Sequence, residues 1–277
     1  MLFASAASAQ PATAVAQQPL STKSALPAWV PPQLFAGGRS LQVLQVQVML
    51  DRAQHSPGVI DGAVGGNTRR AIASYRAANE LGSGDAIDDR LIEHLAQDNG
   101  GELFQTHIIS ESDVAGPFRN VPDEMTGQAK LDTVGFESAA EGLAEKFHMA
   151  ESFLQALNPG SDFSKAGTEI RVIKAGGEQL SAKVAKVEVR KDSNRLLAYD
   201  EGGRLVATYP ITVGSSFHPS PNMTLEVLAV AMDPTYHFDP EGRDWGPDEK
   251  LTIAAGPNNP VGTVWIDLSR DGYGIHG

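Results

Sequence analysis

Gly256-Pro257-Asn258-Asn259-Pro260-Val261-Gly262 and, a few residues later, Tyr273-Gly274-Ile275-His276-Gly277 decide which fold we expect for the last third of this sequence. Both stretches are dense in residues that favour turns. Between them, residues 264–268 form a short run of residues that favour strands. Short strands separated by turns of this kind predict a β-sandwich or barrel for residues 183–277.

The residues before these stretches continue the same pattern. We expect strands around Val187 and Val189, at 195–199, at 204–212 and around Val227. The second and third of these are joined by Asp200-Glu201-Gly202-Gly203, which is typical of a hairpin turn. The whole region is therefore predicted to be mainly β.

Taken in order, these stretches resemble the catalytic domain of L,D-transpeptidases, which has the YkuD-type fold. The resemblance extends to the runs 194–199, Tyr209-Pro210, Val213-Gly214-Ser215, Pro219-Ser220-Pro221, Asp233-Pro234-Thr235-Tyr236 and Trp265-Ile266. In that family a His followed by Gly is the general base, and His276 matches it. The resemblance further suggests Tyr236, Asn258, Asn259 and Gly277 as substrate-binding residues.

The resemblance implies acyl transfer through a cysteine, with no metal and no organic cofactor. A thiolate would attack an amide of a peptidoglycan stem peptide, and an amine of a second stem would resolve the thioester. In the family the Cys follows the His by roughly fifteen to twenty residues, in Ser-x-Gly-Cys-x-Arg. This sequence has no Cys. We therefore expect a catalytic domain that is truncated before its nucleophile and inactive by itself.

A small helical domain is expected at residues 38–96. Apolar residues recur at helical spacing in residues 41–50, and a loop rich in turn residues follows. A second helix, capped by Asn67 or Thr68, and a third short helix complete a three-helix bundle. The bundle resembles the peptidoglycan-binding domain of cell-wall hydrolases, and a generic helical bundle is the alternative. The matching positions are Gly58 to Gly62, Gly66 to Thr68, Ala71, Tyr75 and Leu81.

Residues 131–176 resemble a LysM carbohydrate-binding module, which consists of a strand, two helices and a strand. The opening strand is expected at Asp132-Thr133-Val134, and the second helix ends at Asn158-Pro159-Gly160. A plain helical hairpin is the alternative. Residues 97–130 are expected to be a connector. The runs that match the module are 143–147, 157–159 and 166–168.

The first residues indicate export. Residues 1–9 end in Ala7-Ser8-Ala9, a small-x-small cleavage site, and are interpreted as the remnant of a signal peptide; a flexible tail is the alternative. Residues 10–37 are rich in Pro, Gln, Ala and Ser and are expected to be a disordered linker. The expected fold class is therefore α+β multidomain, and the expected location is the periplasm, in association with the cell wall.

Charge and hydropathy limit the partners. The formal net charge of -12 would repel a phosphate backbone, and no basic run provides a patch for nucleic acid or a membrane surface. No apolar stretch reaches the ~20 residues of a transmembrane helix. The expected partners are peptidoglycan stem peptides and glycan.

Two other kinds of enzymatic site would use residues of the same region. A serine hydrolase triad would use Ser215, His218 and Asp233, but their spacing matches no nucleophile elbow. A zinc peptidase site would use His237, Asp239, Glu241 and His276. The sequence has no His-Glu-x-x-His, so a polar loop is the simpler interpretation and no metal site is expected.

The main rival belongs to another functional class. Because the sequence contains no thiol, a non-catalytic protein that binds peptidoglycan would fit it as well.

Overall fold

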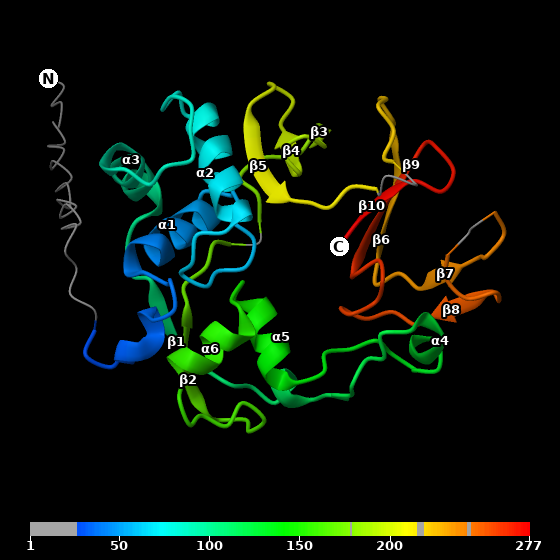
Figure 1. The fold of residues 1–277 in the computed structure, drawn as a ribbon, viewed down its shortest axis with the longest axis horizontal. Coiled ribbons are helices and arrows are strands. Elements are labelled where there is room, and N and C mark those ends of the chain that lie inside the picture. The colour runs from blue at the N-terminus through cyan, green and yellow to red at the C-terminus, as the bar shows by residue number, and fades with distance from the viewer. Residues whose placement is uncertain (1–26, 178, 215–218, 243–244) are drawn as a thin grey trace, which may run out of the picture.

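The computed structural model describes residues 27–177, 179–214, 219–242 and 245–277. Helices form most of the N-terminal part and β-sheets form the C-terminal part (Figure 1). The helices are η1 (Pro32–Phe35), α1 (Leu41–Arg52), α2 (Gly66–Ala78), α3 (Asp89–Asn99), η2 (Ser112–Val114), α4 (Met125–Gln128), α5 (Ala139–Lys146) and α6 (Glu151–Leu157). The strands are β1 (Phe104–Ile108), β2 (Glu169–Ile173), β3 (Lys186–Arg190), β4 (Arg195–Tyr199), β5 (Leu205–Pro210), β6 (Val227–Met232), β7 (Tyr236–Phe238), β8 (Leu251–Ile253), β9 (Val264–Leu268) and β10 (Gly274–His276). Within these ranges no helix has both the length and the apolar character needed to cross a membrane.

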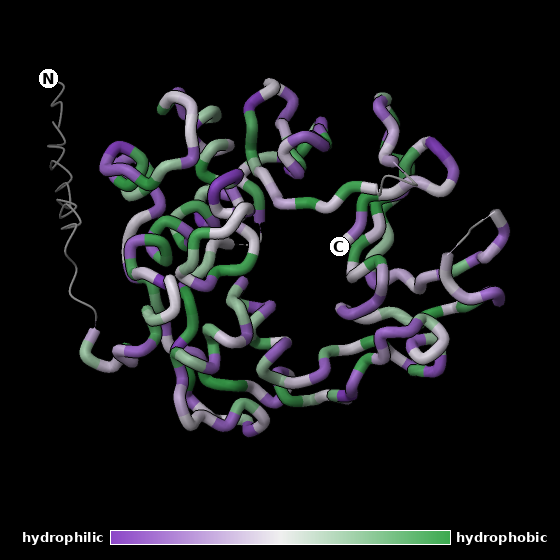
Figure 2. The backbone as a smooth tube through the Cα atoms, viewed as in Figure 1, coloured by the Kyte–Doolittle hydropathy of each residue, from purple (hydrophilic) through white to green (hydrophobic). Residues whose placement is uncertain are grey.

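Helix α1 is buried on two sides. One side packs with α2 and α3 around Val46, Met49, Leu50, Ala71, Ile72, Tyr75, Leu81, Leu91 and Leu95. The other side places Leu44 and Val48 in a second core, shared with α5, α6 and β2. Figure 2 shows hydrophobic segments gathered where these elements meet. The helical part therefore has two cores that share one helix.

Helix α2 begins earlier than expected. It starts at Gly66, and the extended residue Gly65 occupies the capping position without a side-chain hydrogen bond. Asn67 and Thr68 lie inside the first turn, so the prediction that one of them caps the helix is wrong. Glycine occupies the capping position here, as the sequence preference for that position allows.

The prediction of an opening strand at Asp132-Thr133-Val134 is also wrong, because these residues form a loop. The partner of β2 is β1, which lies in the stretch expected to be a connector, and the two strands pair antiparallel from Phe104 with Ile173 to Ile108 with Glu169. About thirty residues, 109–138, therefore separate β1 from α5. Local periodicity could not reveal this pairing, since it joins segments far apart in the sequence.

The residues between β1 and α5 contact the C-terminal part. Val134 N–H donates to Ala255 O (3.2 Å), and Asn258 N–H donates to Val134 O (3.0 Å). Thr133 Oγ1 donates to Ala255 O as well (3.0 Å). In Figure 1, α4 lies beside β8. This segment thus joins the helical part to the β-sheets near β7 and β8.

The C-terminal sheets do not pack as the sandwich that the sequence suggested. Strands β3, β4 and β5 form one sheet, β6, β9 and β10 a second, and β7 with β8 a third. Among the described residues, their only core cluster is small and centres on Ala198, Val206 and Ala207. Four apolar side chains of β6 are more than half exposed: Val227, Leu228, Val230 and Met232. The expectation of β structure is confirmed, whereas no sandwich core is present in the part that the structure describes.

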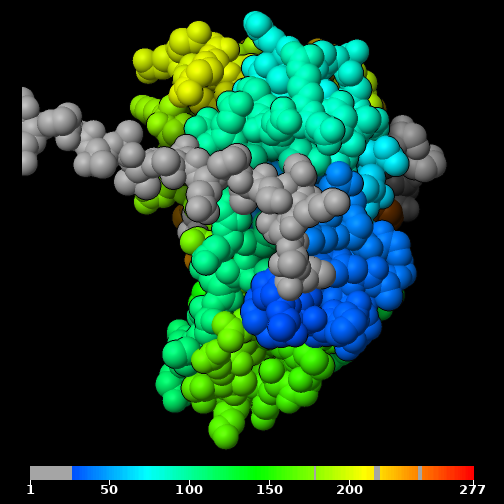
Figure 3. Space-filling view, turned by 90° about the vertical axis from the view of Figure 1, so that its left-hand side faces the viewer, coloured from blue at the N-terminus to red at the C-terminus, as the bar shows by residue number. Residues whose placement is uncertain are grey.

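The helical part and the first sheet are joined beside β5. His55 and Thr208 form a parallel β-bridge. Ser56 N–H donates to Thr208 O (2.9 Å), and Thr208 N–H donates to Gln54 O (2.8 Å). Arg195, which is only 1% exposed, donates to Ser56 O (2.8 Å) and to the Thr208 hydroxyl. Figure 3 shows, on another face, the residues around α1 between those of α2 and α3 above and those around β1 and β2 below.

Candidate active site

The predicted general base, His276, lies in β10 at the edge of a three-stranded sheet. It pairs antiparallel with Trp265 of β9. The imidazole stacks on the indole of Trp265, with ring centroids 5.6 Å apart and an angle of 14° between the planes. Partial burial lowers the pKa of His276 below its ordinary value. The stacking orients the ring against Trp265, and the lowered pKa favours the neutral form, which can accept a proton.

Two glycines allow this arrangement. A Cβ on Gly274 would collide with the Trp265 ring, and a Cβ on Gly262, whose φ is +66°, would collide with the backbone of Gly277. Gly277 continues the pairing of β10, since its N–H donates to Val264 O (3.2 Å) and its carbonyl accepts from Val264 N–H (3.1 Å). The glycines in both sequence motifs thus have a physical reason, which is close approach around the end of β10.

The third glycine of the motif region, Gly256, serves a different contact. A Cβ there would collide with the carbonyl of Val134, in the segment before α5. The two ends of the run 256–262 therefore touch different partners: one contacts the helical part and the other contacts β10. The run connects the expected catalytic residue to the rest of the protein.

The two asparagines of that run bind protein groups. Asn258 Nδ2 donates to Glu141 Oε1 (2.9 Å) and to Gly135 O (3.2 Å). Asn259 is 5% exposed; its Nδ2 donates to Ala254 O (2.7 Å), and its Oδ1 accepts from Val261 N–H (2.9 Å). Both amides shape the loop, and their role in substrate binding stays a prediction.

Tyr236 begins β7 and pairs with Ile253 of β8. Within the described residues no hydrogen bond or ring contact joins it to His276, so its role in substrate binding also stays a prediction. Its neighbour His237 hydrogen-bonds the hydroxyls of Thr252 (3.1 Å) and Thr235 (3.3 Å).

The structure adds little support for the zinc site or the serine triad. Asp239 pairs with Lys250 (2.7 Å), and no three His, Asp or Glu side chains are grouped to hold a metal ion among the residues that the structure describes. Ser215 and His218 of the alternative triad lie outside the described residues, as do residues 1–26 with the expected signal remnant.

Sequence reasoning missed the residue that organises the loop between α1 and α2. Gln47 is 1% exposed. Its Nε2 donates to Asp61 Oδ1 (3.1 Å), Ala63 O (3.1 Å) and Thr68 Oγ1 (3.2 Å). Its Oε1 accepts from the N–H groups of Asp61 (3.2 Å) and Gly62 (2.7 Å). The Asp, Gly and Thr of the quoted motif therefore have a structural role. The signal that could have identified it is a polar Gln on the apolar face of the first helix.

Comparison with known proteins gives two findings. Residues 185–277 match the family model of the YkuD, L,D-transpeptidase catalytic domain, a family that acts on peptidoglycan. A protein of Bacillus licheniformis named L,D-transpeptidase YkuD is 27% identical over 137 residues, which cover 50% of this chain and 68% of that protein. The matched region contains β3 to β10 and both sequence motifs.

Proposed function

We propose, from the premise that residues 185–277 match an L,D-transpeptidase catalytic domain, that this protein acts in forming or remodelling peptidoglycan cross-links. The observation that supports the proposal is the stacking of the His276 imidazole on Trp265, together with its lowered pKa, in the Gly-Ile-His-Gly run that resembles the family's general-base motif. The stacking on Trp265 fixes the ring, and the pairing of Gly277 with Val264 fixes the backbone beside it.

In the proposed reaction the imidazole takes a proton from a thiol, which becomes the nucleophile. The thiolate attacks the carbonyl carbon of a stem-peptide amide, and the imidazolium then protonates the departing amine. The amine of a second stem attacks the thioester and releases the thiol. The 277-residue chain contains no Cys, so it supplies the base of this reaction and not the nucleophile.

The N-terminal modules would hold the protein on its substrate. We propose that residues 38–96 bind peptidoglycan and that the LysM-like part, in which α5 and α6 pack on the β1–β2 pair, binds its glycan. An exported, periplasmic protein would meet this polymer, which agrees with the Ala7-Ser8-Ala9 run.

The second candidate is a peptidoglycan-binding protein without catalysis. The absence of Cys from the chain favours it. Both candidates predict that the chain sediments with purified insoluble peptidoglycan, and His276→Ala should leave this binding unchanged. A chain that stays in the supernatant would contradict the wall-directed part of both.

The gene sequence after codon 277 distinguishes the two candidate functions. An in-frame Ser-x-Gly-Cys-x-Arg after codon 277 supports the enzyme, and a stop codon there supports the binding protein. In the first case the longer product should gain the mass of a carbapenem on its Cys, and Cys→Ala should abolish this adduct. The 277-residue chain should gain no such mass, and stoichiometric zinc in the purified protein would instead favour a metallopeptidase.

A further inference from the structure

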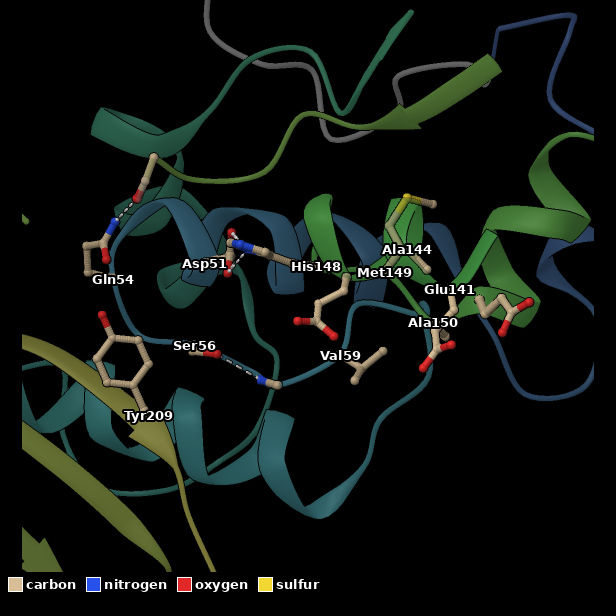
Figure 4. A pocket seen from close by; sticks show the side chains of 14 residues that line it. Asp51, Gln54, Ser56, Val59, Glu141, Ala144, His148, Met149, Ala150 and Tyr209 are labelled. Atoms are coloured by element: carbon tan, nitrogen blue, oxygen red, sulfur yellow. Dashed lines mark hydrogen bonds and ion pairs between the residues drawn. The ribbon is translucent and has the colours of Figure 1, made fainter. Parts of the chain in front are cut away.

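A cavity of about 660 Å³ lies between the helical part and β5, away from His276. It is lined by Asp51, Gln54, Ser56, Gly58, Val59, Glu141, Ala144, Glu145, His148, Met149, Ala150, Glu151, Gly177 and Tyr209. Figure 4 shows Tyr209 across the opening from Glu141 and Ala144. Its size falls in the range of small-ligand sites, which spans roughly 300–1,000 Å³. No lining residue belongs to β6–β10, so the cavity does not include the residues around His276, although Glu141 of its wall accepts a hydrogen bond from Asn258.

The cavity is lined mainly by acidic side chains. Four lining side chains are carboxylates, and the described lining residues include no Lys or Arg. Among the described lining residues, the basic group is the imidazole of His148. Its Nδ1 lies 3.0 Å from Oδ2 of Asp51, which also accepts the N–H of Gly176 (2.8 Å). Asp51 is thus compensated by protein groups, whereas no cation among the described residues forms an ion pair with the other three carboxylates.

The three glutamates differ in their protein partners. Glu141 accepts hydrogen bonds from Glu137 N–H (2.6 Å) and Asn258 Nδ2 (2.9 Å), and Glu151 accepts one from Gln155 (2.9 Å). No described residue donates a hydrogen bond to the carboxylate of Glu145 or forms an ion pair with it. Glu145 is exposed at the rim of the cavity; partial desolvation of its carboxylate raises its pKa, and the neighbouring charge of Glu141 raises it further. A bound cation would relieve both effects.

The other walls are apolar or neutral. Val59, Ala144, Met149 and Ala150 provide aliphatic surface, with Met149 and Ala144 almost fully buried. Burial, followed by the charge of Asp51, raises the pKa of Tyr209, so its hydroxyl stays neutral and its oxygen can accept a hydrogen bond. Apolar walls with a few convergent polar groups are typical of sites that orient a ligand through one charged end.

We infer that this cavity binds a short peptide that carries a free ammonium group, with the ammonium beside Glu145 and the aliphatic chain against Val59 and Met149. An ammonium donates three charge-assisted hydrogen bonds, which suits the carboxylates and the Tyr209 hydroxyl. An anionic ligand would be repelled by the carboxylates, and a neutral one would gain no attraction from them. The inference goes beyond the proposed function and does not depend on the chemistry at His276.

The test is a titration of the whole chain, followed by NMR and calorimetry, with Nα-acetyl-lysine methylamide as the probe. The matched probe is Nα,Nε-diacetyl-lysine methylamide, which keeps the shape and lacks the charge. We expect saturable binding of the first probe and binding about tenfold weaker for the second. Equal binding of both probes, or no saturable binding of the first, would overturn the proposal.

Two pairs of variants locate the site. Glu145→Gln should weaken binding of the charged probe about threefold to fivefold, the size expected for a partly exposed ion pair, whereas Glu93→Gln on α3 should not. Val59→Lys places an ammonium at the cavity and should compete with the probe. Val64→Lys, which lies outside the lining, should bind normally. All four positions are exposed, so folding is expected to survive, and circular dichroism checks it. Normal binding by both Glu145→Gln and Val59→Lys would refute this location.

Discussion

The imidazole of His55 lies against the hydroxyl of Thr208, with 3.3 Å between Nδ1 and Oγ1, although 153 positions separate the two residues. Both are buried, with exposed fractions of 5% and 0%. His55 follows α1, and Thr208 lies in β5, so this contact joins the helical part to the first sheet. The edge of the His55 ring also meets Tyr75 of α2, with centroids 5.2 Å apart. A titratable group is therefore buried where two parts of the protein meet.

The free energy of unfolding should decrease as the pH is lowered, because of His55. Burial, together with the nearby charge of Arg195, lowers the pKa of His55 from 6.5 to about 4. Below pH 6.5 the unfolded chain binds a proton that the folded chain does not bind, so the free energy of unfolding decreases as pH falls. The loss should stop near pH 4, where the folded form also binds the proton. At about 1.4 kcal/mol per pKa unit, its size is on the order of 3 kcal/mol.

Urea unfolding between pH 7.5 and pH 4 measures this effect. In His55→Asn, whose amide can replace Nδ1, the decrease should be smaller than in the unaltered chain by most of that amount. His237→Asn, at an exposed position of β7, is the control and should keep the original slope. Parallel pH profiles for the chain and His55→Asn would contradict the assignment.

Gln47 should contribute far more to the free energy of unfolding than an exposed Gln of the same helix. Gln47→Leu removes five hydrogen bonds and leaves buried groups of the loop without partners. We expect the free energy of unfolding to decrease by about 3 kcal/mol, measured by urea titration. Gln42→Leu, on the exposed face of the same helix, should change it by less than about 0.5 kcal/mol. If the two variants are equally stable, the network does not hold the loop.

Local patterns in the sequence predicted many elements well. The strands expected at 195–199 and 264–268 have those bounds in the structure, because each is a short run of strand formers between turn residues. The stop at Asn158-Pro159-Gly160 was also confirmed, since α6 ends at Leu157. These features depend on neighbouring residues alone, which is why the sequence was sufficient.

Contacts between distant segments could not be predicted in this way. The pairing of β1 with β2 depends on a segment whose burial does not alternate, and its apolar residue Ile108 is exposed. The Asp51–His148 pair spans 97 positions. At the candidate site, the motif identified His276, but its stacking on Trp265 follows from the register of β9 and β10. Register is a property of the assembled sheet.

Two glycines with similar backbones should respond differently to alanine. Gly262 and Gly272 have φ angles of +66° and +77°, but only at Gly262 would a Cβ collide with another part of the chain, the backbone of Gly277. Gly272→Ala should cost about 1 kcal/mol from the left-handed conformation alone. Gly262→Ala should in addition separate β10 from β9.

Amide hydrogen exchange shows the difference. Gly277 N–H, which donates to Val264 O, should exchange faster in Gly262→Ala and at the original rate in Gly272→Ala. Equal exchange of this amide in both variants would mean that the close approach has no structural role.

The stacking of Trp265 on His276 should control the charge of the imidazole. Partial burial lowers the pKa of His276, because the charged form loses hydration. Trp265→Thr keeps a residue that favours strands but uncovers one face of the ring, so the pKa should rise toward 6.5. An NMR titration of the His276 Cε1 proton measures it. Trp245→Leu, which removes a ring packed on Phe238 instead, should leave this pKa unchanged. An unchanged value in Trp265→Thr would show that the indole does not keep the imidazole neutral, and the argument for a general base at this position would lose its physical support.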